Sequence, residues 1–186
     1  MNTAIFGSLT DQHLLQFGKI IQLFARYELL MQQVMATVSG ADPAAILLLT
    51  RGLDFSAKRT ALLDLLYHGT IPLDQYDRIN AFLMVPHTLT PLRNDIAHAG
   101  WISDTFSSWI QPDWILQLPP SVRPLRDASG SSGAHFIERE QDKTAYTLDG
   151  LDQIVESLAT NCQDLSGYLC EIGLIRAQGE ILAAHA

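Results

Sequence analysis

A long apolar stripe over residues 10–38 constrains the fold of this chain more than any other feature. Its side chains recur at steps of three and four residues: Leu14, Phe17, Ile21, Phe24, Met31, Met35 and Val38. This spacing places them on one face of a helix of about eight turns, and that face has to be buried against other elements. Thr10 or Ser8 can cap the start, and Ser39-Gly40 ends the pattern.

The same spacing predicts further helices on both sides of a central region. We expect a short helix over 43–52 with Asp42 as N-cap, a third from Ser56 as N-cap to Gly69, a fourth from about Leu73, and a last one over 148–176. Pro86 and Pro91 fall inside the fourth pattern. Because each removes a backbone donor and crowds the preceding turn, we expect a break over 85–91 before a helix resumes over 92–99.

Residues 101–147 differ in composition from both flanks. Short strands are predicted at 109–110 and 114–118, and a hairpin at 135–139 and 144–147. The expected fold is therefore all-α. It is an antiparallel bundle of four to five helices with a small β or irregular insertion before the last helix, in a single domain over 1–186.

Charge and composition narrow the function classes. The net charge of −8 disfavours broad nonspecific binding to nucleic acid, which needs Lys and Arg to neutralise phosphates, although it leaves room for one small basic cleft. The longest aliphatic run of the chain is Ile46–Leu49, which is too short to span a bilayer. The N-terminus lacks the pattern of a secretory signal. Cys162 and Cys170 are eight residues apart in a helical pattern and are expected to be free thiols. A cytoplasmic protein is expected.

Glu28 interrupts the apolar stripe of the first helix. Two interpretations are open. The carboxylate can reach water at the edge of the stripe, or it can be buried and paired with an arginine from another helix. Arg93 is the candidate partner, because it lies in mostly apolar surroundings and a guanidinium gives paired hydrogen bonds to a carboxylate.

The stretch PLRNDIAHAGW, residues 91–101, gathers four polar groups at the expected end of a helix: Arg93, Asn94, Asp95 and His98. Asn94 and His98 are four residues apart and share a face, and the long Arg93 side chain can reach the same volume. In the last turn the helix dipole favours the imidazolium form of His98, which suits proton transfer, while Arg93 suits a phosphate. The alternative is structural: a histidine that caps carbonyls and a salt-bridged arginine.

This motif resembles the signature of the HEPN superfamily, a group of small all-helical domains. LRNDIAHAGW is similar to the LRN-x-x-AH-G form of bacterial members, and LDFSAKRTALLDLL is similar to the helix that often precedes it. A long first helix with an inward glutamate is also similar. The resemblance covers 10–100 and 148–176 and leaves 101–147 unexplained.

The resemblance implies a metal-independent endoribonuclease in which a ribose 2′-hydroxyl attacks the adjacent phosphate. Arg93, Asn94 and His98 take the catalytic positions, and Glu28 and Asp95 form a supporting polar network. It further implies a homodimer with facing motifs, an RNA substrate, and an antitoxin or other protein partner in a toxin–antitoxin or defence setting. No cofactor is expected, and the six histidines show no His-x-x-x-His or Glu-x-x-His spacing for a metal. The alternative is a noncatalytic dimeric domain that binds a nucleotide or partner protein.

Overall fold

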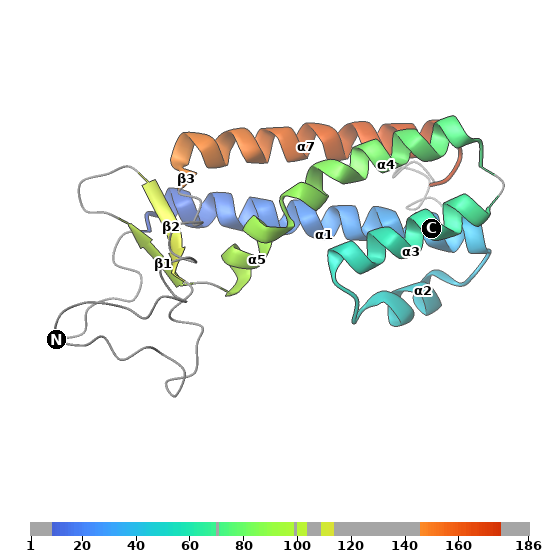
Figure 1. The fold of residues 1–186 in the computed structure, drawn as a ribbon, viewed down its shortest axis with the longest axis horizontal. Coiled ribbons are helices and arrows are strands. Elements are labelled where there is room, and N and C mark those ends of the chain that lie inside the picture. The colour runs from blue at the N-terminus through green and yellow to red at the C-terminus, as the bar shows by residue number, and fades with distance from the viewer. Residues whose placement is uncertain (1–8, 70, 99, 104–108, 114–145, 176–186) are drawn as a thin grey trace, which may run out of the picture. The chain divides into compact units, whose positions relative to one another are not determined.

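Helices make up most of the chain in the computed structural model, which describes residues 9–69, 71–98, 100–103, 109–113 and 146–175 (Figure 1). The helices are α1 (Asp11–Ser39), α2 (Pro43–Thr50), α3 (Phe55–His68), α4 (Leu73–Thr88), α5 (Thr90–His98) and α7 (Leu148–Glu171). The strands are β1 (Gly100–Ser103), β2 (Trp109–Asp113) and β3 (Tyr146–Thr147). A mostly helical fold is therefore confirmed, as the apolar stripes predict.

The cap of α3 differs from the expectation. Asp54, not Ser56, is the N-cap, and its carboxylate accepts a hydrogen bond from the backbone N–H of Ala57 at 2.7 Å. Both residue types cap helices well, but a residue two positions earlier lets Phe55 enter the first turn, where it is buried. Ser56 lies inside the helix instead, with its hydroxyl 3.4 Å from Nδ1 of His87. The predicted Asp42 cap of α2 is confirmed, with a 2.6 Å bond from the N–H of Ala44.

The predicted break between the fourth pattern and the motif is present. Pro86 lies inside the last turn of α4, which ends at Thr88, and Leu89 has non-helical backbone angles. Pro91 follows in the first turn of α5, where a proline costs no helical hydrogen bond. Gly100, expected to follow a helix end, opens strand β1.

Contacts divide the chain into two compact units. One, here the motif unit, runs up to Lys19 and resumes over Leu92–Val155; the other, the helical unit, comprises Ile20–Pro91 and the chain from Glu156 on. The boundaries fall within α1 and α7. The single domain expected over 1–186 stays a prediction.

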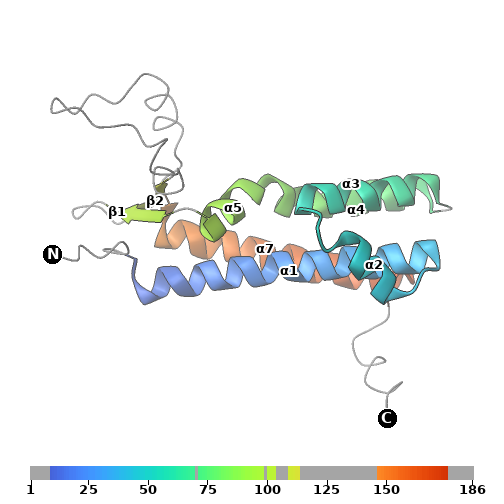
Figure 2. The same ribbon diagram turned by 90° about the horizontal axis from the view of Figure 1, so that it is seen from below.

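In the helical unit, Tyr27 of α1 joins the final helix. Its hydroxyl lies 3.0 Å from the carbonyl oxygen of Leu158 and 2.6 Å from Oδ1 of Asn161. Burial, with smaller contributions from Cys162 and Asp164, raises the pKa of Tyr27, so the hydroxyl stays a donor. α3 and α4 run side by side along this unit (Figure 2).

In the motif unit, the strands form an antiparallel sheet in the order β1-β2-β3. Gly100 pairs with Asp113, and Ile110 pairs with Tyr146. Trp101 of β1 is 4% exposed and packs against Phe17 of α1, with ring centroids 4.5 Å apart. The strand predicted at 109–110 is confirmed and extends to Asp113. The segments predicted at 114–118 and 135–139 lie outside the described residues, and β1 was not predicted.

No helix among the described residues combines the length and apolar character needed to cross a membrane. Cys162 and Cys170 are free thiols, as expected from their spacing. Burial raises the pKa of the Cys162 thiol, which keeps it protonated inside the helical unit.

Candidate functional site

Helix α5 presents the motif on the surface of the motif unit. Leu92 is 2% exposed and anchors the helix, while the next residue, Arg93, is half-buried. Nη1 of Arg93 donates a hydrogen bond to Oδ1 of Asn94 at 3.2 Å. This bond holds one corner of the guanidinium and leaves other N–H donors for a ligand.

His98 ends α5 and is exposed to solvent. Its place in the last turn puts it beside backbone carbonyls that have no partner within the helix. No described residue forms a hydrogen bond or ion pair with its ring. The imidazole is therefore open to an incoming ligand, as proton transfer requires.

Asp95 has a different environment from its neighbours in the motif. Burial raises the pKa of its carboxyl group to about 6, and no described cation pairs with it. Arg93 is bound to Asn94 instead. The predicted supporting role of Asp95 in a polar network stays a prediction.

Glu28 has a cationic partner from another helix, but that partner is a lysine. Nζ of Lys58 on α3 donates to Oε2 of Glu28. The Lys58 side chain is 6% exposed and that of Glu28 is 23% exposed, so the pair is largely withdrawn from water. Arg93 and His98 belong to the motif unit, and the predicted contact of Glu28 with either of them stays a prediction.

The spacing of residues in α3 predicts that Lys58 is buried. Phe55, Lys58 and Leu62 are spaced by three and four residues, so Lys58 lies on the buried face of α3. A cation inside one apolar stripe is expected to pair with an anion inside another, because burying the two charges as a pair costs much less free energy than burying either one alone.

The motif unit also buries polar atoms that lack a partner among the described residues: Nε2 of His13, Oε1 of Gln16 and Nε1 of Trp101. His13 accepts a hydrogen bond at Nδ1 from the backbone N–H of Thr10, at 3.3 Å, so its neutral ring carries the proton on Nε2. Burial lowers the pKa of His13 and favours that neutral form. Sequence reasoning did not single out these groups, since periodicity alone does not show which polar positions are buried.

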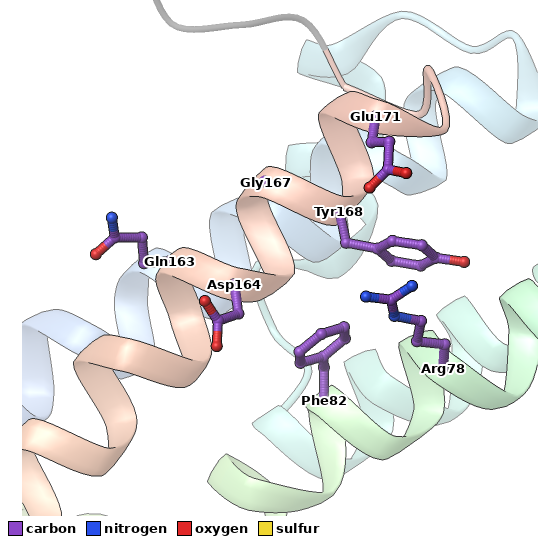
Figure 3. Close-up of a pocket in the computed structure, with 7 residues that line it drawn as sticks. All are labelled: Arg78, Phe82, Gln163, Asp164, Gly167, Tyr168 and Glu171. Atoms are coloured by element: carbon purple, nitrogen blue, oxygen red, sulfur yellow. The ribbon is translucent and has the colours of Figure 1, made fainter.

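An open groove lies in the helical unit between α4 and α7 (Figure 3). Its volume is about 460 Å³, and its lining includes Arg78, Phe82, Asp164, Gly167, Tyr168 and Glu171. The Arg78 guanidinium lies 4.2 Å from the ring centre of Tyr168 and 6.0 Å from that of Phe82. A Cβ added at Gly167 would meet nothing within 4 Å, so the groove floor is bare there.

The groove contains the Arg78 guanidinium, stacked on Tyr168, and the carboxylates of Asp164 and Glu171. Among the described residues these groups form no ion pair with one another. Such a lining offers aromatic surface, N–H donors and carboxylate acceptors to a ligand. Local sequence patterns do not predict this groove, because Arg78 and Tyr168 lie on different helices and are 90 residues apart in the sequence.

The described residues contain no group of three or more His, Cys, Asp or Glu side chains placed to hold a metal ion. Comparison of the chain with models of protein families, with curated proteins and with solved structures finds no match.

Proposed function

We propose that this chain is a HEPN-type endoribonuclease that cleaves RNA without a metal ion. The observation that carries the proposal is the arrangement at the end of α5. An arginine is oriented by the neighbouring amide, at 3.2 Å, and a solvent-open histidine follows in the last turn of the same helix. A cation held by the neighbouring amide and an accessible imidazole on the same short helix suit phosphate chemistry better than helix packing.

In the proposed reaction the ribose 2′-oxygen bonds to the adjacent phosphorus, and the bond from phosphorus to the 5′-oxygen breaks. His98 takes the 2′-hydroxyl proton while water protonates the leaving 5′-oxygen, or it gives a proton to the leaving oxygen while water takes the one from the 2′-hydroxyl. Arg93 stabilises the charge that builds up on the phosphoryl oxygens, and Asn94 holds Arg93 in place. The products are a cyclic phosphate and a free 5′-hydroxyl.

The proposed setting is a cytoplasmic homodimer that faces two such sites toward one another. Two Arg93 side chains would then supply a local positive field despite the net charge of −8. An antitoxin or other protein partner belongs to the same proposal.

Cleavage of a labelled RNA in excess chelator tests the reaction. We expect cyclic-phosphate ends from the parent protein, and a rate at least about 100-fold lower in His98→Ala and Arg93→Ala, because proton transfer or charge stabilisation is lost. His68→Ala is the matched control, since His68 is also an exposed histidine that ends a helix. Its rate should equal that of the parent. If folded His98→Ala cuts as fast as the parent, the assigned site is wrong.

A second candidate function is noncatalytic binding of a nucleotide or a partner protein, and the groove between α4 and α7 favours it. Titration with nucleoside monophosphates, followed by chemical shifts of residues in α4 and α7, tests the nucleotide case. Gly167→Leu should block binding without unfolding, because the added side chain enters open space. A parent protein that binds there and never cuts RNA would favour this function over the nuclease.

A further inference from the structure

Helix α2 exposes an apolar surface. Within it only Ile46 and Thr50 are buried. The solvent-exposed fractions are 52% for Leu47, 64% for Leu48 and 75% for Leu49. Contiguous exposed aliphatic side chains of this kind are uncommon on monomeric proteins and mark interaction sites.

Two more exposed leucines occur in the segments next to α2. Leu53, after the helix, is 39% exposed, and Leu29 on α1 is 53% exposed. Leu29 lies one helical turn before Gln32, whose amide donates to Thr50 Oγ1 at 3.0 Å. We call Leu29, Leu47, Leu48, Leu49 and Leu53 the leucine patch. All of it belongs to the helical unit, where the bond from Gln32 to Thr50 joins α1 to α2 and α2 lies along α1 (Figure 2).

The helix that carries the patch is held in place. Asp42 caps its first turn, Pro43 sets the backbone of its first residue, and Thr50 ties its last turn to α1. A partner would therefore meet a preformed surface and would not have to order it on binding.

Charge indicates what covers the patch. The chain has a net charge of −8, so two copies repel each other over most of their surface. Residues 43–53 contain no acidic residue and only one cation, Arg51. Arg51 is exposed and pairs with no described carboxylate. The same features disfavour an anionic lipid surface, which attracts segments rich in Lys and Arg.

The ends of α2 complement each other when two copies pack antiparallel. Asp42 precedes the helix and Arg51 follows it, so a two-fold axis near the middle brings Arg51 toward Asp42 of the partner subunit. Ala44 and Leu48 are four residues apart on the exposed face, and the small alanine lets the two helices approach closely.

We propose that the leucine patch is a contact between two copies of this chain, with α2 packed antiparallel on α2 about a two-fold axis. This inference goes beyond the proposed nuclease and needs neither Arg93 nor His98. The patch comprises five leucines, far fewer than the roughly 20–30 residues per side of a typical stable interface, so the dimer is expected to dissociate in the micromolar range.

Sedimentation equilibrium of the full chain tests the contact. The mean mass of the parent should rise with concentration toward twice its starting value, which is 20.6 kDa for a single chain and double that if the motif sites also pair. Leu48→Asp and Leu48→Lys should each raise the dissociation constant at least tenfold. Leu73→Asp is the matched control, because Leu73 is 67% exposed on α4 and lies outside the patch. It should dimerise like the parent.

A mixture tests the symmetry. Equal amounts of Leu48→Asp and Leu48→Lys should associate again, because a two-fold axis places residue 48 of each copy near its counterpart and the new charges then attract. His98→Ala should leave the dimer unchanged, which separates this contact from any pairing of motif sites. A parent whose mass does not rise with concentration, a folded Leu48→Asp whose mass rises as the parent's does, or a mixture that fails to recover the parent's mass would each overturn the proposal.

Discussion

A carboxylate and an ammonium group lie inside two apolar stripes and are paired: Glu28 on α1 and Lys58 on α3. Removing either one leaves the other with little access to water. Lys58 is the more deeply buried, so it suffers more from the loss of its partner. We expect the pair to fix how α3 lies on α1, since buried pairs of this kind add little net stability over well-packed apolar residues.

Because Lys58 is more deeply buried than Glu28, removing the charge of Glu28 should destabilise the protein more than removing that of Lys58. Glu28→Gln should lower the free energy of unfolding by about 3 kcal/mol, because Lys58 becomes an uncompensated buried charge. Lys58→Met should cost less, because Glu28 reaches water more easily. The double variant should recover most of the loss. Urea unfolding of all four proteins measures the coupling, and strictly additive losses would show that the pair does not act as a unit.

Asp95 makes stability depend on pH in the opposite sense from a salt-bridged aspartate. Burial raises its pKa from 3.8 to about 6, so between these values the folded chain holds a proton that the unfolded chain has lost. Stability contributed by the neutral carboxyl is full below about pH 4 and is lost as pH rises toward 6.

Asp95→Asn should therefore stabilise the protein at pH 7 and change little at pH 4. The gain is about 1 kcal/mol, well below the full conversion of the pKa shift, because the side chain is only half-buried and water screens it. Thermal unfolding at both pH values measures it. Asp152→Asn, at an exposed position of α7, is the control and should show no such difference. An equal gain from both variants would point to net charge instead of burial.

At the scale of elements, the N-cap of α3 is Asp54 in the structure, whereas the sequence predicts Ser56. Asp54→Ala should lower the free energy of unfolding by about 1 kcal/mol, because the N–H of Ala57 loses its acceptor. Ser56→Ala should cost less, since its hydroxyl makes only a long contact of 3.4 Å with His87. The reverse order in urea unfolding would restore Ser56 as the functional cap.

Helices were the predictable part of the fold because their signals are local. The stripe of α1, the proline that opens α2 and the prolines around Leu89 each act within a few residues, and the corresponding bounds are close to the expected ones. Strand β1 escaped prediction because four residues after a helix carry too little pattern. Its partner, β2, lies across a segment whose length no local rule specifies.

Site prediction had the same limit. Local spacing placed Arg93, Asn94 and His98 on one short helix. It did not reveal Lys58 as the partner of Glu28, nor the stacking of Arg78 on Tyr168, because both contacts join segments that are distant in sequence. Choosing between several cations for one buried carboxylate requires the tertiary arrangement.

For the whole molecule, the acidic charge limits how RNA can be held. A protein that neutralises many phosphates loses about 10³–10⁵ in affinity between 50 and 200 mM salt. A site that neutralises one or two phosphates, with Arg93 of one or both subunits, would lose only about three- to tenfold, while salt also screens the repulsion between RNA and a surface of net charge −8. The two effects oppose each other.

If the proposed nuclease is correct, kcat/KM for RNA cleavage should change by less than about tenfold from 50 to 200 mM salt. Asp152→Lys, an exposed site in the motif unit, should raise kcat/KM by about twofold at 50 mM, because it weakens the repulsion. The gain in kcat/KM should vanish at about 1 M salt, where the Debye length falls to about 3 Å. Asp152→Asn should give about half of that gain. A fall of a thousandfold with salt in the parent would instead require several phosphate contacts besides Arg93, and the binding surface would then have to include other cations.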